Sequence, residues 1–193
     1  MVITSRSNEI RKFGTTAALV LNFLPPEAYW YFFKFLAFGS VDSSEHPKLE
    51  AIAMEMARCM KGSFIAANII SGFLRNTTNA RHWSLCLAHF RANIQRNVSL
   101  FGEGPEDLIR KNKYAFFFLN RDETLVHSSY RSCLAKDNVP SLTINNVINR
   151  SVKHGERFDL LVWKSHIPPY NYYTASCMIE KTIEGALSSA MAN

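Results

Sequence analysis

Residues Leu24–Arg75, which read LPPEAYWYFFKFLAFGSVDSSEHPKLEAIAMEMARCMKGSFIAANIISGFLR, decide the fold of this chain. The stretch predicts three consecutive helices. The first runs to Phe38 and opens with Pro-Pro-Glu, which suits a first helical turn because proline has no N–H to leave unpaired there. Gly39 is placed to end it in a left-handed turn, and Lys61-Gly62 is placed to end the second helix. The third begins at Phe64, so the stretch indicates a helical body.

Apolar residues set the faces of these helices. In the second helix they recur at the spacing of one helical face, at Leu49, Ile52, Ala53, Met56, Ala57 and Met60. The first helix is apolar almost all round, so we expect it to be buried on every side, with Trp30 and Phe33 in the core. After a loop at Asn76–Asn79, the same type of spacing predicts a fourth helix, with Trp83, Leu87, Phe90 and Ile94 on one face. A four-helix core is therefore expected.

The flanking segments predict a mixture of helices and strands. Before the helices, Val2-Ile3 has the sequence of a strand end, Asn8–Phe13 of a short helix and Ala18–Phe23 of a second strand. After Leu100 the predicted elements are one or two helical turns at Glu106–Arg110, a strand at Tyr114–Leu119, a short helix or strand at Ser141–Ile148, a strand at Phe158–Trp163 and a closing helix at 175–190. The predicted class is mainly α with some β, an α+β fold.

Composition limits the function only broadly. The chain has 193 residues and a net charge of +6, which permits an acidic partner without naming one. Its four cysteines are widely spaced and form no C-x-x-C pair, so we expect reduced thiols in a cytoplasmic protein and no metal site. No signal sequence or membrane span is apparent, and no membrane partner is expected. Arg81, Arg91 and Arg96 do not share one helical face, so no nucleic-acid partner is expected either.

Three motifs carry a resemblance to a known family. Residues Leu24–Phe38 resemble the motif L-P-x-x-x-A-W-x-L-F-x-x-x-A-F of the NB-ARC domain, the nucleotide-binding domain of plant disease-resistance proteins. Identical residues stand at Leu24, Pro25, Trp30, Phe33, Ala37 and Phe38. Cys59, Gly62 and Ala66 are similar to the family's Cys-x-Gly-Leu-Pro-Leu-Ala motif, although Ser63, Phe64 and Ile65 replace its Leu-Pro-Leu. Val2–Arg6 resembles the strand that ends in Thr-Thr-Arg. The resemblance covers the chain to about Ile94.

The resemblance implies a domain organisation and a site. Residues 1–23 would be a remnant of the α/β nucleotide-binding sheet of a P-loop NTPase, residues 24–98 an ARC-type helical subdomain, and residues 99–193 a small, irregular α/β extension without leucine-rich repeats. Arg6 would contact nucleotide phosphate, and Gly62, Ser63, Phe64 and Ile65 would line the adenine side of an ADP or ATP site. The chain has no G-x-x-x-x-G-K-[ST] run to hold phosphates and magnesium, so we expect no hydrolysis and no enzyme activity.

Two functions stay open at this point. In the first, the chain is a truncated NB-ARC protein of plant defence that keeps half of an ADP or ATP site, with weak or absent binding by the isolated chain. In the second, it is a helical interaction module that binds no nucleotide and acts as a decoy or regulator of intact resistance proteins. Partners in either case would be other resistance-protein subunits or signalling proteins.

Overall fold

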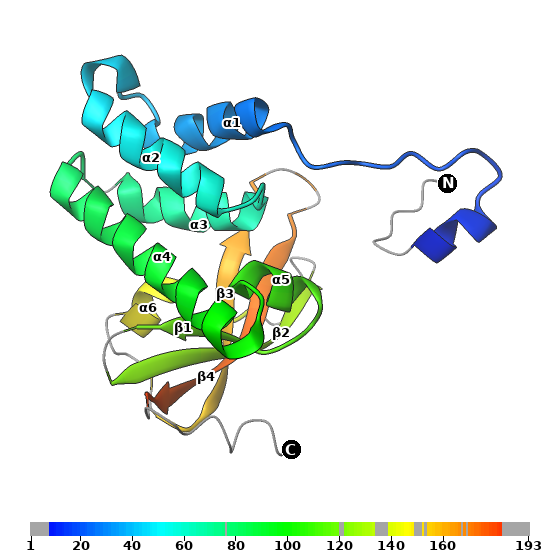
Figure 1. Cartoon of the computed structure of the whole chain (residues 1–193). Coiled ribbons are helices and arrows are strands. Elements are labelled where there is room, and N and C mark those ends of the chain that lie inside the picture. The colour runs from blue at the N-terminus through cyan, green and yellow to red at the C-terminus, as the bar shows by residue number, and fades with distance from the viewer. Residues whose placement is uncertain are drawn as a thin grey trace.

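The protein has a mixed α+β fold, as the sequence predicts. Its computed structural model describes residues 8–75, 77–119, 122–133, 139–148, 152, 154–166, 168 and 170–182. Figure 1 shows the first four α-helices gathered on one side of an antiparallel sheet, with the N-terminal segment extending away from both. Among the described helices, none is long and apolar enough to cross a membrane.

The four helices of the helical part lie close to their predicted positions. They are α1 Pro26–Phe38, α2 Pro47–Cys59, α3 Phe64–Leu74 and α4 Ala80–Phe101, preceded by the short 3-10 helix η1 Asn8–Phe13 and interrupted by η2 Ser43–Glu45. Gly39 ends α1 at φ +62°, and Lys61 and Gly62 reverse the chain after α2 at φ +48° and +82°. The Asn79 side chain caps α4 by accepting hydrogen bonds from two backbone N–H groups. The glycines and the asparagine cap therefore determine where these helices begin and end.

One hydrophobic core holds α1 to α4 together. Its buried members are Tyr29, Phe33, Ala37, Phe38, Leu49, Ala53, Met56, Ala57, Met60, Ala67, Leu74, Trp83 and Leu87. Phe33 is fully buried, as predicted, whereas Trp30 lies at the edge of this core and is only partly buried. The expectation that α1 is buried on every side is wrong, because Tyr31 and Phe35 are 68% and 71% exposed. The neighbours of α1 are α2 and α3, which leave its outer face uncovered.

The predicted strand at Ala18–Phe23 is also wrong. These residues have no regular secondary structure, and every residue from 11 to 28 is exposed. A strand forms only beside another strand that satisfies its N–H and C=O groups. In the described part of the chain, all strand pairing takes place in a sheet that begins at Ala115. The predicted strand end at Val2-Ile3 lies outside the described residues.

The second half of the chain forms a four-stranded antiparallel sheet in the order β1-β2-β4-β3. The strands are β1 Ala115–Phe118, β2 Glu123–Cys133, β3 Arg157–Lys164 and β4 Tyr172–Lys181, with the short helices α5 Pro105–Arg110 and α6 Ile144–Ile148 beside them. The predictions of β1 and β3 are confirmed, as is the helical alternative at 144–148. Strand β2 was not predicted.

The closing helix predicted from residue 175 is wrong for its first part. Residues 175–181 belong to β4, while 183–190 lie outside the described residues. Ala175, Cys177 and Ile179 alternate into a second hydrophobic core, together with Leu125 and Leu160 of the neighbouring strands. This alternation has the period of a strand. It is hard to recognise in the sequence because the residues between the buried ones are also small or apolar.

Two buried asparagines of α4 join the helical part to the sheet. Strand β1 is an edge strand, so its outer N–H and C=O groups have no strand partner. The Asn97 side-chain amide donates to the Phe116 carbonyl over 2.6 Å and accepts from the Phe116 N–H over 3.0 Å. Asn93 accepts from the Phe118 N–H over 2.7 Å. The two side chains thus act on β1 as a neighbouring strand would.

Candidate functional site

The residues predicted to contact nucleotide occupy the turn between α2 and α3. Gly62 lies in that turn, Ser63 is the N-cap of α3, and Phe64 and Ile65 form the first helical turn. The Ser63 hydroxyl accepts a hydrogen bond from the Ala66 N–H over 3.2 Å, as an N-cap does. Arg6, the predicted phosphate contact, lies outside the described residues. The structure thus brings together four of the five predicted residues, which are consecutive in sequence.

Aromatic side chains from three elements surround this turn. The Tyr29 hydroxyl of α1 donates to the Ser63 carbonyl over 2.7 Å, and the rings of Phe32 and Phe64 meet edge to face at 5.0 Å. On the other side, a Cβ added at Gly62 would lie 3.3 Å from the ring of Phe23. The positive φ favours glycine at this position, and the contact with the Phe23 ring would be tight for any side chain. The N-terminal segment therefore touches the helical part at the turn.

The carboxyl group of Glu106, from α5, lies beside the same turn. Its Oε2 atom is buried and has no hydrogen-bond partner within the described residues. Burial raises the pKa of Glu106 to about 7, and a hydrogen bond with the Ser63 side chain and the charges of Arg110 and Lys61 oppose that rise. Burial, and then the charge of Glu106, raise the pKa of Tyr29 above its usual range. Above pH 7 this carboxyl group places a negative charge beside the turn that the resemblance assigns to the adenine side.

The protonation of Glu106 gives a testable pH dependence. A carboxyl group with a raised pKa in the folded state stabilises the protein fully below its unfolded pKa, and that contribution is lost as pH rises through the folded pKa. We expect the free energy of unfolding to fall by about 2 kcal/mol between pH 4.5 and 8 because of this group. Urea denaturation of the wild type and of Glu106→Gln at both pH values measures the difference.

The variant Glu106→Gln separates the contribution of Glu106 to the pH dependence of stability from the contributions of other groups that titrate in this range. Glu106→Gln keeps the shape of the side chain but not the proton equilibrium, so it should be more stable than the wild type at pH 8 and nearly equal at pH 4.5. Glu45→Gln, which changes an exposed carboxyl group in the helical part, serves as the control. Equal stability of Glu106→Gln and wild type at pH 8 would contradict the assignment of a carboxyl group whose pKa is raised by burial.

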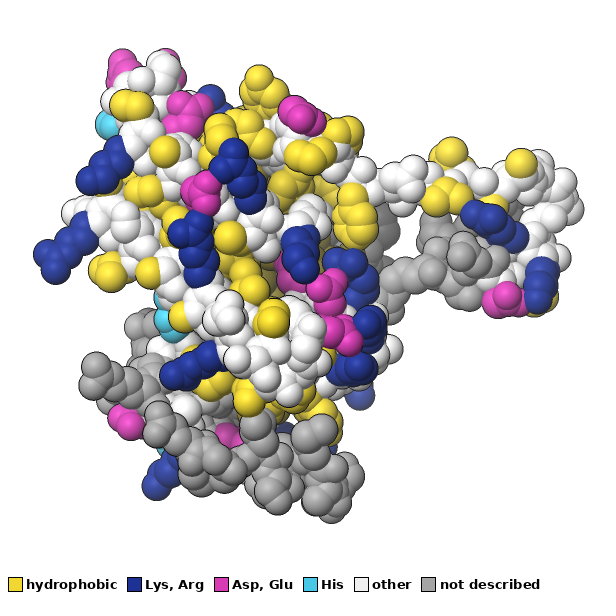
Figure 2. Space-filling model, in the orientation of Figure 1, with side chains coloured by type: hydrophobic (Ala, Val, Ile, Leu, Met, Phe, Trp, Pro, Cys, Tyr) yellow, Lys and Arg dark blue, Asp and Glu magenta, His cyan; other side chains and the backbone are white. Residues whose placement is uncertain are grey.

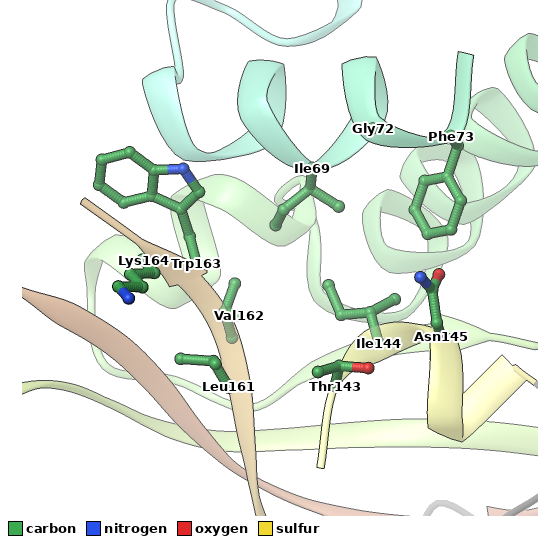
Figure 3. Close-up of a pocket in the computed structure, with 10 residues that line it drawn as sticks. All are labelled: Ile69, Gly72, Phe73, Thr143, Ile144, Asn145, Leu161, Val162, Trp163 and Lys164. Carbon is green, nitrogen blue, oxygen red and sulfur yellow. The ribbon is translucent and has the colours of Figure 1, made fainter. Parts of the chain in front are cut away.

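A second feature is a cleft of about 250 Å³ where the helical part meets the sheet. Its lining comes from α3, β3 and the start of α6: Ile69, Gly72, Phe73, Thr143, Ile144, Asn145, Leu161, Val162, Trp163 and Lys164. In Figure 3 the side chains of Ile69 and Phe73 point down from α3, and those of Val162 and Ile144 face them from below. Sequence reasoning did not find this cleft, because its α3 wall lies about 70 to 95 positions from the other walls and shares no motif with them.

A third feature is an exposed apolar surface at the N-terminal end. It consists of the arm, which we define as residues 18–24, and the outer face of α1. Its large apolar residues are Leu19, Val20, Leu21, Phe23, Leu24, Tyr31 and Phe35. Figure 2 shows hydrophobic side chains both over the helical part around α1 and along the extended N-terminal segment. Leu19 and Leu21 are each 87% exposed, a state that apolar side chains in water avoid when they can.

Comparisons with known proteins leave the chain without an assigned family. No protein-family model, no curated protein and no solved structure matches it. In the described part of the chain, no group of three or more His, Cys, Asp or Glu side chains is placed to hold a metal ion.

Proposed function

We propose that this protein is a relative of the NB-ARC domain of plant disease-resistance proteins and acts in plant defence as a cytoplasmic interaction module without catalytic activity. The observation that carries this proposal is the exposed arm, which is continuous with the exposed aromatic face of α1. Large contiguous apolar surfaces of this kind mark sites of protein association. The motif resemblance supports the proposed relation to the NB-ARC family, and the exposed surface supports the proposed role in protein association.

The composition of the arm indicates what would cover it. Ala18–Phe23 reads Ala-Leu-Val-Leu-Asn-Phe, which is typical of a buried strand in an α/β sheet. A strand without a sheet gains hydrogen bonds for its backbone and burial for both of its faces by adding to the open edge of another sheet. We therefore infer that the partner is the α/β nucleotide-binding half of an intact resistance protein, another subunit of the same type. The aromatic residues Tyr31 and Phe35 would lie at the border of that contact.

A residual nucleotide half-site is the second candidate. It would use Arg6 together with Gly62, Ser63, Phe64 and Ile65, and it would require the partner to supply the phosphate-binding loop. Phe23 covers Gly62 and the carboxyl group of Glu106 lies next to Ser63, so we expect weak or no ADP or ATP binding by the isolated chain. If ADP raised the melting temperature of the isolated chain, and Arg6→Ala removed that rise, the half-site would be favoured instead.

The proposal is tested by measuring association of the full chain with a purified NB-ARC nucleotide-binding domain. The double variant Leu19→Asp/Leu21→Asp places two charges on the arm. Both side chains are almost fully exposed, so the melting temperature should stay the same while the affinity for the partner falls more than about tenfold. Leu85→Asp is the matched control, because Leu85 is an exposed leucine on α4 away from the arm.

Two results would overturn this function. The first is a complex that forms equally well with the arm variant and with the wild type. The second is sedimentation of the isolated wild-type chain as a dimer and of the arm variant as a monomer. A second copy of the chain would then be the partner that covers this surface. Binding that is lost in the arm variant and kept in Leu85→Asp supports the proposed partner.

A further inference from the structure

The cleft between α3 and β3 lies between the two hydrophobic cores of the molecule. Leu74 and Ala67 belong to the core of the helical part, while Val162 and Ile144 pack against the core of the sheet. The side chains that line the cleft leave about 250 Å³ open between these cores. A partly apolar cleft that is large enough for several carbon atoms and opens to solvent can admit a small molecule.

We propose that this cleft binds a small planar aromatic carboxylate. Pockets for drug-sized ligands measure roughly 300–1,000 Å³, so this smaller space suits a ligand with one or two fused rings. Ile69 and Phe73 approach from α3 and Val162 from β3, with the space between them (Figure 3). A flat ring placed there contacts apolar side chains on both faces, and an edge-to-face contact with Phe73 adds to the attraction.

Polar groups at the two ends of the cleft determine the chemistry of the ligand. In Figure 3 Lys164 and Trp163 lie at one end, and Asn145 lies at the other with its amide turned toward Phe73. The Lys164 ammonium is 5.4 Å from the centre of the Tyr172 ring, and it takes part in none of the ion pairs between described residues. Its long side chain is exposed, so the ammonium can turn to meet a carboxylate at the mouth of the cleft.

Gly72 keeps the helix side of the cleft open. A Cβ at this position would meet nothing within 4 Å, and the residue is exposed on the surface of α3. Glycine in the middle of a helix is less stabilising than alanine, so this position is not optimised for helix stability. Without a side chain there, a ring can lie directly against the α3 backbone between Ile69 and Phe73.

The test compares two nearly identical probes, 2-naphthoate and the uncharged 2-naphthamide, by isothermal titration calorimetry with the full chain. The wild type should bind the naphthoate about three- to tenfold more tightly, because only the carboxylate pairs with Lys164, and added salt should reduce that preference. Lys164→Gln should lower the affinity for naphthoate to that for naphthamide. Lys111→Gln, which removes a surface lysine next to Glu103, is the control and should leave both affinities unchanged.

A second variant tests the location independently of charge. Gly72→Leu fills the space beside α3 and should abolish binding of both probes, while the melting temperature should stay the same or rise because leucine favours the helix. The proposal is overturned if the wild type binds neither probe or binds both equally well. It is also overturned if Lys164→Gln or Gly72→Leu keeps the wild-type affinity for naphthoate. It is independent of the proposed partner, since the arm variant should bind naphthoate normally.

Discussion

Replacing Trp83 by alanine should lower the free energy of unfolding by about 5 kcal/mol. Trp83 is 1% exposed and lies at the centre of the helical core, where its ring meets that of Phe38 edge to face at 5.1 Å. Its indole N–H donates to the Leu74 carbonyl over 3.2 Å and to the Thr77 carbonyl over 2.8 Å. The substitution therefore opens a large cavity and removes the indole donor from the Thr77 carbonyl, while the Leu74 carbonyl still accepts from the Thr77 N–H. Urea denaturation followed by circular dichroism measures the loss.

Two further variants separate these contributions. Trp83→Phe keeps most of the ring but loses the N–H, so it should cost about 1–2 kcal/mol for the Thr77 carbonyl that loses its donor, plus the smaller loss of volume. Trp163→Ala is the matched control, because that indole is only partly buried at the edge of the cleft, and it should cost less than half as much as Trp83→Ala. A loss below about 2 kcal/mol in Trp83→Ala would mean that the helical core is not packed around this ring.

The second large effect should come from Asn97→Ala, with an expected loss of about 3–4 kcal/mol. Asn97 is fully buried, and its amide holds both the N–H and the carbonyl of Phe116 on the edge strand β1. Alanine would leave both backbone groups buried without partners, and each such group costs roughly 1–3 kcal/mol. Hydrogen exchange is the most direct measurement, because the Phe116 amide should lose its protection in the variant.

Asn93→Ala provides the comparison within the same helix. On β1, Asn93 accepts a hydrogen bond only from the N–H group of Phe118, a residue that is less buried than Phe116. The free energy of unfolding should therefore fall by about 1 kcal/mol in Asn93→Ala. Protection should be lost at Phe118 in that variant and kept at Phe116. Equal stability of the Asn97→Ala variant and the wild type would show that α4 does not pair with β1 in solution.

Elements with strong local signals could be predicted from the sequence. The helix α2 carries an apolar stripe with helical spacing, Gly39 and Gly62 supply positive φ after α1 and α2, and Asn79 supplies a cap. Each of these signals acts within a few residues, so the order of the helices and their ends follow from sequence neighbours. The candidate residues Gly62–Ile65 follow from the motif resemblance, which spans consecutive positions, whereas Glu106 and Tyr29 beside that turn come from distant segments.

The sequence by itself determined the helices α1 to α4, the strands β1 and β3, and therefore the α+β class. Tertiary structure decided that 175–181 is a strand, because Ala175, Cys177 and Ile179 become apolar partners of Leu125 and Leu160 only within a sheet. It also decided that Ala18–Phe23 stays unpaired and exposed, that Asn97 is buried, and that a cleft opens between α3 and β3. The physical reason is range: helical hydrogen bonds join residues four apart, whereas strand pairing, burial and cavities depend on contacts between distant parts of the chain.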